Sequence, residues 1–126
     1  MKRSWIGFVL LVLLLATALL SAAAMIRLCE EDVSRLTAAS EEALKGNWEA
    51  AACLIAQAHH SWDSWEFFRC AMADHTPAEE IEALFSRLEV YSSARERITF
   101  AAVCREAAQK LEALGDAHRL NLHNLL

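Results

Sequence analysis

The chain of 126 residues contains few of the residues that interrupt helices. It has one Pro and three Gly. Sandwiches and barrels need frequent tight turns, and those turns depend on Gly and Pro for their special backbone angles. The abundant residues are instead Ala, Leu and Glu, which are good helix formers. The composition therefore predicts an all-α fold and argues against a turn-rich β fold.

Charge is absent from a long stretch near the N-terminus. From Trp5 to Ile26 the only polar side chains are those of Thr17 and Ser21. A helix of this length spans roughly 33 Å, which is enough for a hydrocarbon core of about 30 Å. We therefore expect residues 1–27 to be an uncleaved transmembrane helix (a signal-anchor) that continues into a helical domain over residues 28–126.

The charges at the two ends of this stretch predict its orientation. Lys2 and Arg3 precede it, whereas Glu30, Glu31 and Asp32 follow it closely. Positive residues stay on the cytoplasmic side. We expect a single pass through the cell membrane, with the N-terminus in the cytoplasm and the domain outside.

Cleavage of the N-terminal stretch is the main alternative. Ala22, Ala23 and Ala24 form a small-residue site, and cleavage near Ala24 would release a secreted helical binding protein. The uncharged run is longer than the apolar part of most signal peptides, and the helical pattern continues beyond it. Lipidation of Cys29 is disfavoured because Arg27 precedes it closely.

The remaining domain is acidic. Residues 28–126 contain 9 basic and 17 acidic side chains, a formal net charge of −8. Such a domain is repelled by phosphate backbones and by anionic lipid surfaces. Nucleic acid is therefore excluded as an expected partner.

Helix breaks divide this domain near its first third. Nothing between Ile26 and Lys45 breaks a helix, so the anchor should run directly into the domain. Gly46 suits the left-handed position after a helix, and Asn47 is a strong N-cap. A second helix is expected to begin at Trp48 and to run to Met72.

Two further helices are expected. Residues 76–79, Thr-Pro-Ala-Glu, form a capping box with Pro at the first helical position. Ser92 and Ser93 are the expected turn after this helix, and Gly115 is expected to end or weaken the next one. The last helix carries a heptad-like seam of Phe100, Cys104, Ala107, Leu111 and Leu114. Together the segments predict a small antiparallel bundle of about four helices.

The motifs of common catalytic and cofactor sites are missing. There is no Cys-x-x-Cys, no Glu-x-x-His and no Gly-rich phosphate loop. We expect no catalytic residue, no cofactor and no enzymatic activity. The four Cys residues are expected to be small apolar side chains, although a disulfide between Cys53 and Cys104 is possible if their helices lie side by side.

One spacing leaves a metal site open as a weaker alternative. His59 and Asp63 are four residues apart and share a helix face, as metal ligands on a helix do. With His75 they would form a metal-binding sensor or enzyme. Such a spacing is also common in exposed helices, where these residues are simply solvated. Acidic residues of the third helix, such as Glu79, Glu80 and Glu82, are expected on solvated faces.

Aromatic residues crowd the second helix and suggest a partner surface. Adjacent residues point in different directions, so one core stripe cannot receive all of them, and exposed aromatic side chains mark interfaces. The simpler interpretation is that neighbouring helices cover the aromatic residues, and that Asp74 and His75 shape the corner before the third helix by bonding free backbone groups. The candidate interaction surface consists of Trp48, Trp62, Trp65, Phe68, Asp74 and His75.

Self-association is a second way to bind a partner. The Ala-rich stretch 16–24 allows two membrane helices to approach closely. Joint replacement of Ala18 and Ala22 by Leu should then disrupt self-association. The expected partners are thus the membrane, crossed once, and a protein or a second copy of the chain.

The order of these features resembles the uncharacterised bacterial family DUF4363. The matching positions span nearly the whole chain: Trp48 with Ala51, Trp62, Asp74-His75, Arg87-Leu88 with Tyr91, and Asn124-Leu125-Leu126. The resemblance implies one N-terminal membrane helix followed by about a hundred helical residues, and no assigned activity. This chain is richer in Ala, Arg and Cys than the Lys- and Ile-rich family pattern.

Overall fold

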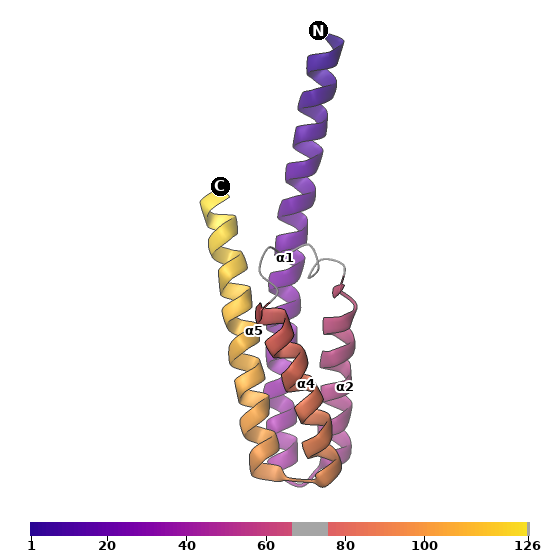
Figure 1. Cartoon of the computed structure of the whole chain (residues 1–126), viewed down its shortest axis with the longest axis vertical. Helices are drawn as coiled ribbons and strands as arrows, with labels where there is room; N and C mark the ends of the chain where they lie inside the picture. The colour runs from indigo at the N-terminus through magenta and orange to yellow at the C-terminus, as the bar shows by residue number, and fades with distance from the viewer. Residues whose placement is uncertain (67–75, 126) are drawn as a thin grey trace.

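The computed structural model describes residues 1–66 and 76–125, and all regular structure in these ranges is helical. The helices are α1 (Lys2–Leu44), α2 (Trp48–Asp63), α4 (Thr76–Ala94) and α5 (Arg97–Leu125). Successive helices run in opposite directions and pack around the C-terminal half of α1 (Figure 1). The expected all-α fold, with about four antiparallel helices, is confirmed.

Helix α1 is one unbroken helix of 43 residues. Its N-terminal half extends alone beyond the bundle (Figure 1), and the side chains of residues 1–18 are all exposed. Partial burial begins at Leu19, and Met25 is already 2% exposed. The expected continuity between the apolar stretch and the domain is therefore confirmed.

The turn after α1 forms as predicted at Gly46 but not at Asn47. Gly46 has φ +84°, its N–H donates to the carbonyl of Ala43, and the N–H of Asn47 donates to the carbonyl of Glu42. These two bonds form the Schellman pattern that ends many helices. The Asn47 side chain does not cap α2: its Nδ2 donates to Glu42 Oε2 at 2.9 Å.

The core contains one apolar stripe from each helix. The predicted seam of α5 is confirmed, because Phe100, Cys104, Ala107 and Leu111 are all 0% exposed and Leu114 is packed against them. Helix α1 packs most extensively against α5, along the line where the two antiparallel helices meet. The largest fully buried side chains of the bundle are Trp62, Phe85 and Phe100.

Two helix ends differ from the prediction. Helix α2 ends at Asp63, before Met72, and Ser64 Oγ donates to the Ser61 carbonyl in its last turn. Helix α4 instead passes the expected turn at Ser92 and Ser93 and ends at Ala94.

The serines stay helical because their hydroxyls can bond within the helix. Ser93 Oγ donates to the Glu89 carbonyl at 3.0 Å, four residues earlier. The turn lies at Arg95, where φ is 55°.

Helix α5 also continues through Gly115, where we expected it to end or weaken. Gly115 is buried against α1, and a Cβ atom built there would lie 3.3 Å from Cys29 Cβ. The missing side chain lets the two helices approach closely. Packing across this contact compensates for the low helix propensity of Gly, about 1 kcal/mol below that of Ala.

Replacing Gly115 by Leu is expected to lower the free energy of unfolding by about 1–3 kcal/mol, because the side chain must push α5 away from α1. Urea unfolding of the full chain in detergent micelles, followed by circular dichroism, measures this change. The control is Ala113→Leu, which adds an apolar side chain on the exposed face of α5. Equal stability of the two variants would contradict close packing at Gly115.

Candidate functional site

The aromatic residues of the predicted interaction surface that the structure describes pack within or against the core. Trp62 is 0% exposed, because α2 packs this face into the bundle, so Trp62 is a core residue and leaves the candidate surface. Trp48 is half-buried, and its ring meets Phe100 edge-on with centroids 5.2 Å apart. Trp65 is half-buried against the same core. Phe68, Asp74 and His75 lie outside the described residues.

A groove that no sequence pattern predicted, with apolar side chains on part of its wall, lies at the end of the bundle remote from the N-terminus. Ile98 is 81% exposed and Leu44 is 46% exposed, and both line a hollow of about 460 Å³ between the end of α1 and the start of α5. Its other lining residues are Ala101, Ala102, Arg105, Glu106 and Gln109. The sequence feature that could have indicated this groove is Ile98, an apolar residue that lies outside the apolar seam beginning at Phe100.

The described cysteines are free thiols. Cys53 is exposed, whereas Cys29 and Cys104 are buried. The disulfide between Cys53 and Cys104 that the sequence left open is absent, because one thiol faces solvent and the other faces the core. Burial raises the pKa of Cys29 and of Cys104 to about 12. Both buried thiols are protonated at neutral pH and are poor nucleophiles.

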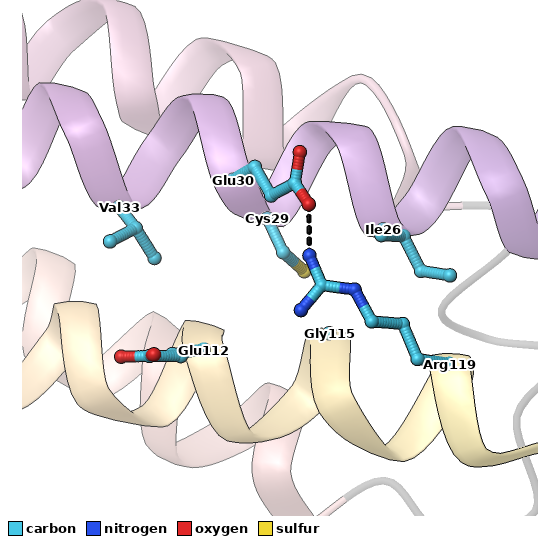
Figure 2. A pocket seen from close by; sticks show the side chains of 7 residues that line it. All are labelled: Ile26, Cys29, Glu30, Val33, Glu112, Gly115 and Arg119. Carbon is cyan, nitrogen blue, oxygen red and sulfur yellow. Dashed lines mark hydrogen bonds and ion pairs between the residues drawn. The ribbon is translucent and has the colours of Figure 1, made fainter.

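A small pocket lies between α1 and α5 beside Gly115. Figure 2 shows Arg119 reaching from α5 to form an ion pair with Glu30 of α1, with Cys29 beneath it. The pocket measures about 170 Å³. Gly115 is one of the residues that line it, and the thiol that it contains is unreactive, so it does not resemble a catalytic centre.

A buried carboxyl group lies deeper in α1. Asp32 is 0% exposed, and it accepts a hydrogen bond from Arg35 Nη1 at 2.8 Å on Oδ1. Its Oδ2 has no hydrogen-bond partner among the described residues. Burial raises the pKa of Asp32 from 3.8 to about 6, although interactions with Arg35 and Ser61 lower it in part. This carboxyl group therefore binds a proton more tightly in the folded protein than in the unfolded chain.

Polar side chains of α2 and α4 also meet, and we call His59, Asp63 and Glu82 the α2–α4 cluster. His59 Nε2 lies 2.8 Å from Glu82 Oε1 and 3.4 Å from Asp63 Oδ2. One potential ligand atom from each residue lies within 4.8 Å of the others. The expected pairing of His59 with Asp63 is therefore present, and the predicted third member, His75, lies outside the described residues.

Glu82 was missed because the sequence places it 23 residues from His59, on a helix face expected to be solvated. Its side chain instead turns toward α2, where its second oxygen accepts a hydrogen bond from Trp62 Nε1 at 3.0 Å. Of the described residues, this cluster is the set best suited to hold a metal ion. Imidazole and carboxylate are the ligand types that Zn²⁺ accepts.

The comparisons with known proteins give one match. The model of the family "Domain of unknown function (DUF4363)" matches residues 19–125 of this chain. No curated protein and no solved structure gives a significant match. The match covers the whole bundle and begins where the burial of α1 begins, so the family and the packed domain coincide.

Replacing Asp32 by Asn is expected to stabilise the bundle at pH 7.5 by about 3 kcal/mol. Because the pKa is raised in the folded state, the contribution of the carboxyl group to stability is greatest below pH 3.8 and is lost as the pH rises through about 6. The advantage of the variant should therefore vanish near pH 4. Urea unfolding at about pH 4, 6 and 7.5 measures it.

Asp116→Asn is the control for this experiment, since Asp116 is an exposed carboxylate that pairs with Arg119. Its effect on stability should be within about 0.5 kcal/mol at every pH. An Asp32→Asn variant less stable than the wild type at pH 7.5 would contradict the raised pKa.

Proposed function

Since the chain belongs to the DUF4363 family, a family of unknown function, we propose that it is a single-pass membrane protein with an acidic helical domain outside the cytoplasm. The domain acts as an interaction or structural module and is not an enzyme. One observation carries the proposal: the apolar half of α1 extends beyond the bundle, and none of the other described helices covers it (Figure 1).

The exposure of this segment supports a membrane as its environment. The helix is long and apolar enough to cross a membrane. Almost none of its most apolar segment is buried in the bundle. Leu11, Leu14 and Leu20 are 64%, 69% and 71% exposed. A core helix of a water-soluble domain would have these side chains covered, and in water their exposure would be costly.

The packing of α1 favours an uncleaved anchor over a cleaved signal. Cleavage near Ala24 would cut the helix where it already packs in the bundle, because Ala22 and Ala24 are half-buried and Met25 is 2% exposed. A secreted form would lose these contacts. We therefore favour the anchored form.

The location outside the cytoplasm rests on the charges that flank the apolar segment. Lys2 and Arg3 lie before it, and the domain that follows carries many more acidic than basic residues. Lys and Arg stay on the cytoplasmic side during insertion. The same negative charge argues against nucleic acid as a partner.

Membrane fractionation of a C-terminally tagged chain tests the anchor and its orientation. The tag should remain with the membrane after alkaline extraction, and protease added to intact spheroplasts should digest it. A soluble tag would contradict the anchor, and a membrane-bound tag protected from protease would contradict the orientation.

A matched pair of variants separates insertion from folding. Joint replacement of Leu13 and Leu14 by Arg should release the chain from the membrane, because each Arg near the centre of a span costs about 2.5–3.5 kcal/mol of insertion free energy. Replacement of Val90 by Arg places one such charge on the bundle surface, where Val90 is 63% exposed. This control should remain in the membrane.

The interaction role is supported by the exposed apolar groove at Leu44 and Ile98, since exposed apolar patches mark partner surfaces. A photo-reactive amino acid at position 98 should give cross-linked products in intact cells. The same amino acid at position 90, also exposed but outside the groove, is the control. Equal yields at the two positions would contradict a partner at the groove.

A further inference from the structure

We propose that the α2–α4 cluster binds one divalent transition-metal ion, with Zn²⁺ as the best match. This inference goes beyond the membrane-bound interaction module and does not depend on it. The ligands would be His59 Nε2, Asp63 Oδ2 and Glu82 Oε1, which come from two helices that meet only through tertiary packing.

The distances between the three ligand atoms suit a small ion. Zn²⁺ bonds to nitrogen and oxygen at about 2.0–2.2 Å, so tetrahedral ligand atoms are roughly 3.3 Å apart. His59 Nε2 lies 3.4 Å from Asp63 Oδ2 and 2.8 Å from Glu82 Oε1, and the three ligand atoms all lie within 4.8 Å of one another. Small side-chain rotations are enough to bring the three atoms around one ion.

The imidazole of His59 is already oriented for this role. Its ring stacks on the ring of Phe85 with centroids 4.8 Å apart and an interplanar angle of 10°. Phe85 is itself 0% exposed, so its position is fixed by the core. On the other side of the ring, Nδ1 lies 3.7 Å from Glu89 Oε1. In the metal-free protein Nε2 donates to Glu82 Oε1. A metal on Nε2 would replace that hydrogen and leave Nδ1–H facing the Glu89 carboxylate, the outer arrangement that many zinc sites use.

The carboxylate of Glu82 is held in a similar way. Trp62 Nε1 donates to Glu82 Oε2 at 3.0 Å, and Trp62 is 0% exposed. This bond occupies one carboxylate oxygen and directs the other, Oε1, toward His59. Two of the three ligands, His59 and Glu82, thus contact residues that the core immobilises, Phe85 and Trp62.

The donor set selects among metals. Ca²⁺ takes six to eight oxygen ligands and Mg²⁺ usually retains several waters, so neither is suited to an imidazole with two carboxylates. Zn²⁺ accepts both imidazole nitrogen and carboxylate oxygen as ligands, and imidazole favours Zn²⁺ over the two hard cations. The side chains of Asp63 and Glu82 are 53% and 43% exposed, so water can complete the coordination and the ion can enter from solvent.

The bound ion would join α2 to α4. These helices contact each other less extensively than α1 contacts α5, so a bond across their interface should have a measurable effect on stability. A ligand that binds only the folded state raises its stability in proportion to the logarithm of ligand concentration. Zn²⁺ should therefore raise the melting temperature of the protein.

The test is titration of the full chain in detergent micelles with Zn²⁺ alone, after treatment with a chelator and buffer exchange. Calorimetry should give one ion per chain with a Kd below roughly 10 μM. Glu82→Gln and Asp63→Asn should each weaken binding more than about tenfold. Gln can still accept the bond from Trp62, so Glu82→Gln should retain the fold, which circular dichroism checks.

Two controls separate this site from adventitious binding. His60→Gln removes an exposed neighbouring imidazole, and Cys53→Ser removes an exposed thiol; both should bind Zn²⁺ as the wild type does. Wild-type binding weaker than the stated Kd would overturn the proposal. So would loss of binding in either control together with unchanged binding in Glu82→Gln and Asp63→Asn.

Substitution of Co²⁺ gives an independent spectroscopic result. Visible bands without a thiolate charge-transfer band are expected for nitrogen and oxygen ligands, and these bands should disappear in Glu82→Gln. A thiolate band would place the ion on a cysteine and overturn the assignment.

Discussion

The structure depends on one constraint, which is that α1 is a single helix shared by the exposed apolar segment and the bundle. No Pro interrupts it between Lys2 and Leu44, and the helix continues through Gly7. A helix without Pro or an internal packing defect is stiff over this length. The bundle is therefore not tethered to the apolar segment by a linker: its direction and rotation are set by the same rod. In the proposed membrane protein, the domain would be held at a defined height and angle above the lipid.

The α1–α5 contact builds on that rod. Close approach at Gly115 brings Cys29 into the core, and the ion pair between Arg119 and Glu30 bridges the edge of the same contact (Figure 2). An exposed ion pair contributes little to stability, so the packing of small residues and of the α5 seam holds the two helices together. The cysteine serves as a small apolar side chain, and this explains why its thiol is protonated and unreactive.

The sequence predicted most of the fold because the relevant signals are local. Each of these signals links residues within one or two turns of helix. They are the helical period of the apolar residues, the turn at Gly46 and the seam from Phe100 to Leu111, and the structure confirms all of them. What failed depends on contacts between distant segments. Gly115 looks like a helix breaker until α1 is placed against it. Glu82 looks like a solvated charge until α2 brings His59 to it, and Trp62 looks like a candidate surface residue until α1 and α4 cover it.

Polar side chains are buried or half-buried mainly around α2 and hardly at all between α1 and α5, so the bundle has a polar part and an apolar part. The α1–α5 contact is mainly apolar, whereas α2 faces Asp32 through Ser61 on one side and presents His59 to Glu82 on the other. Apolar contacts respond little to protons, but the free energy of a buried carboxyl group such as that of Asp32 responds strongly. The pH dependence that Asp32 introduces therefore lies where α1 meets α2, through Ser61, and not in the seam between α1 and α5.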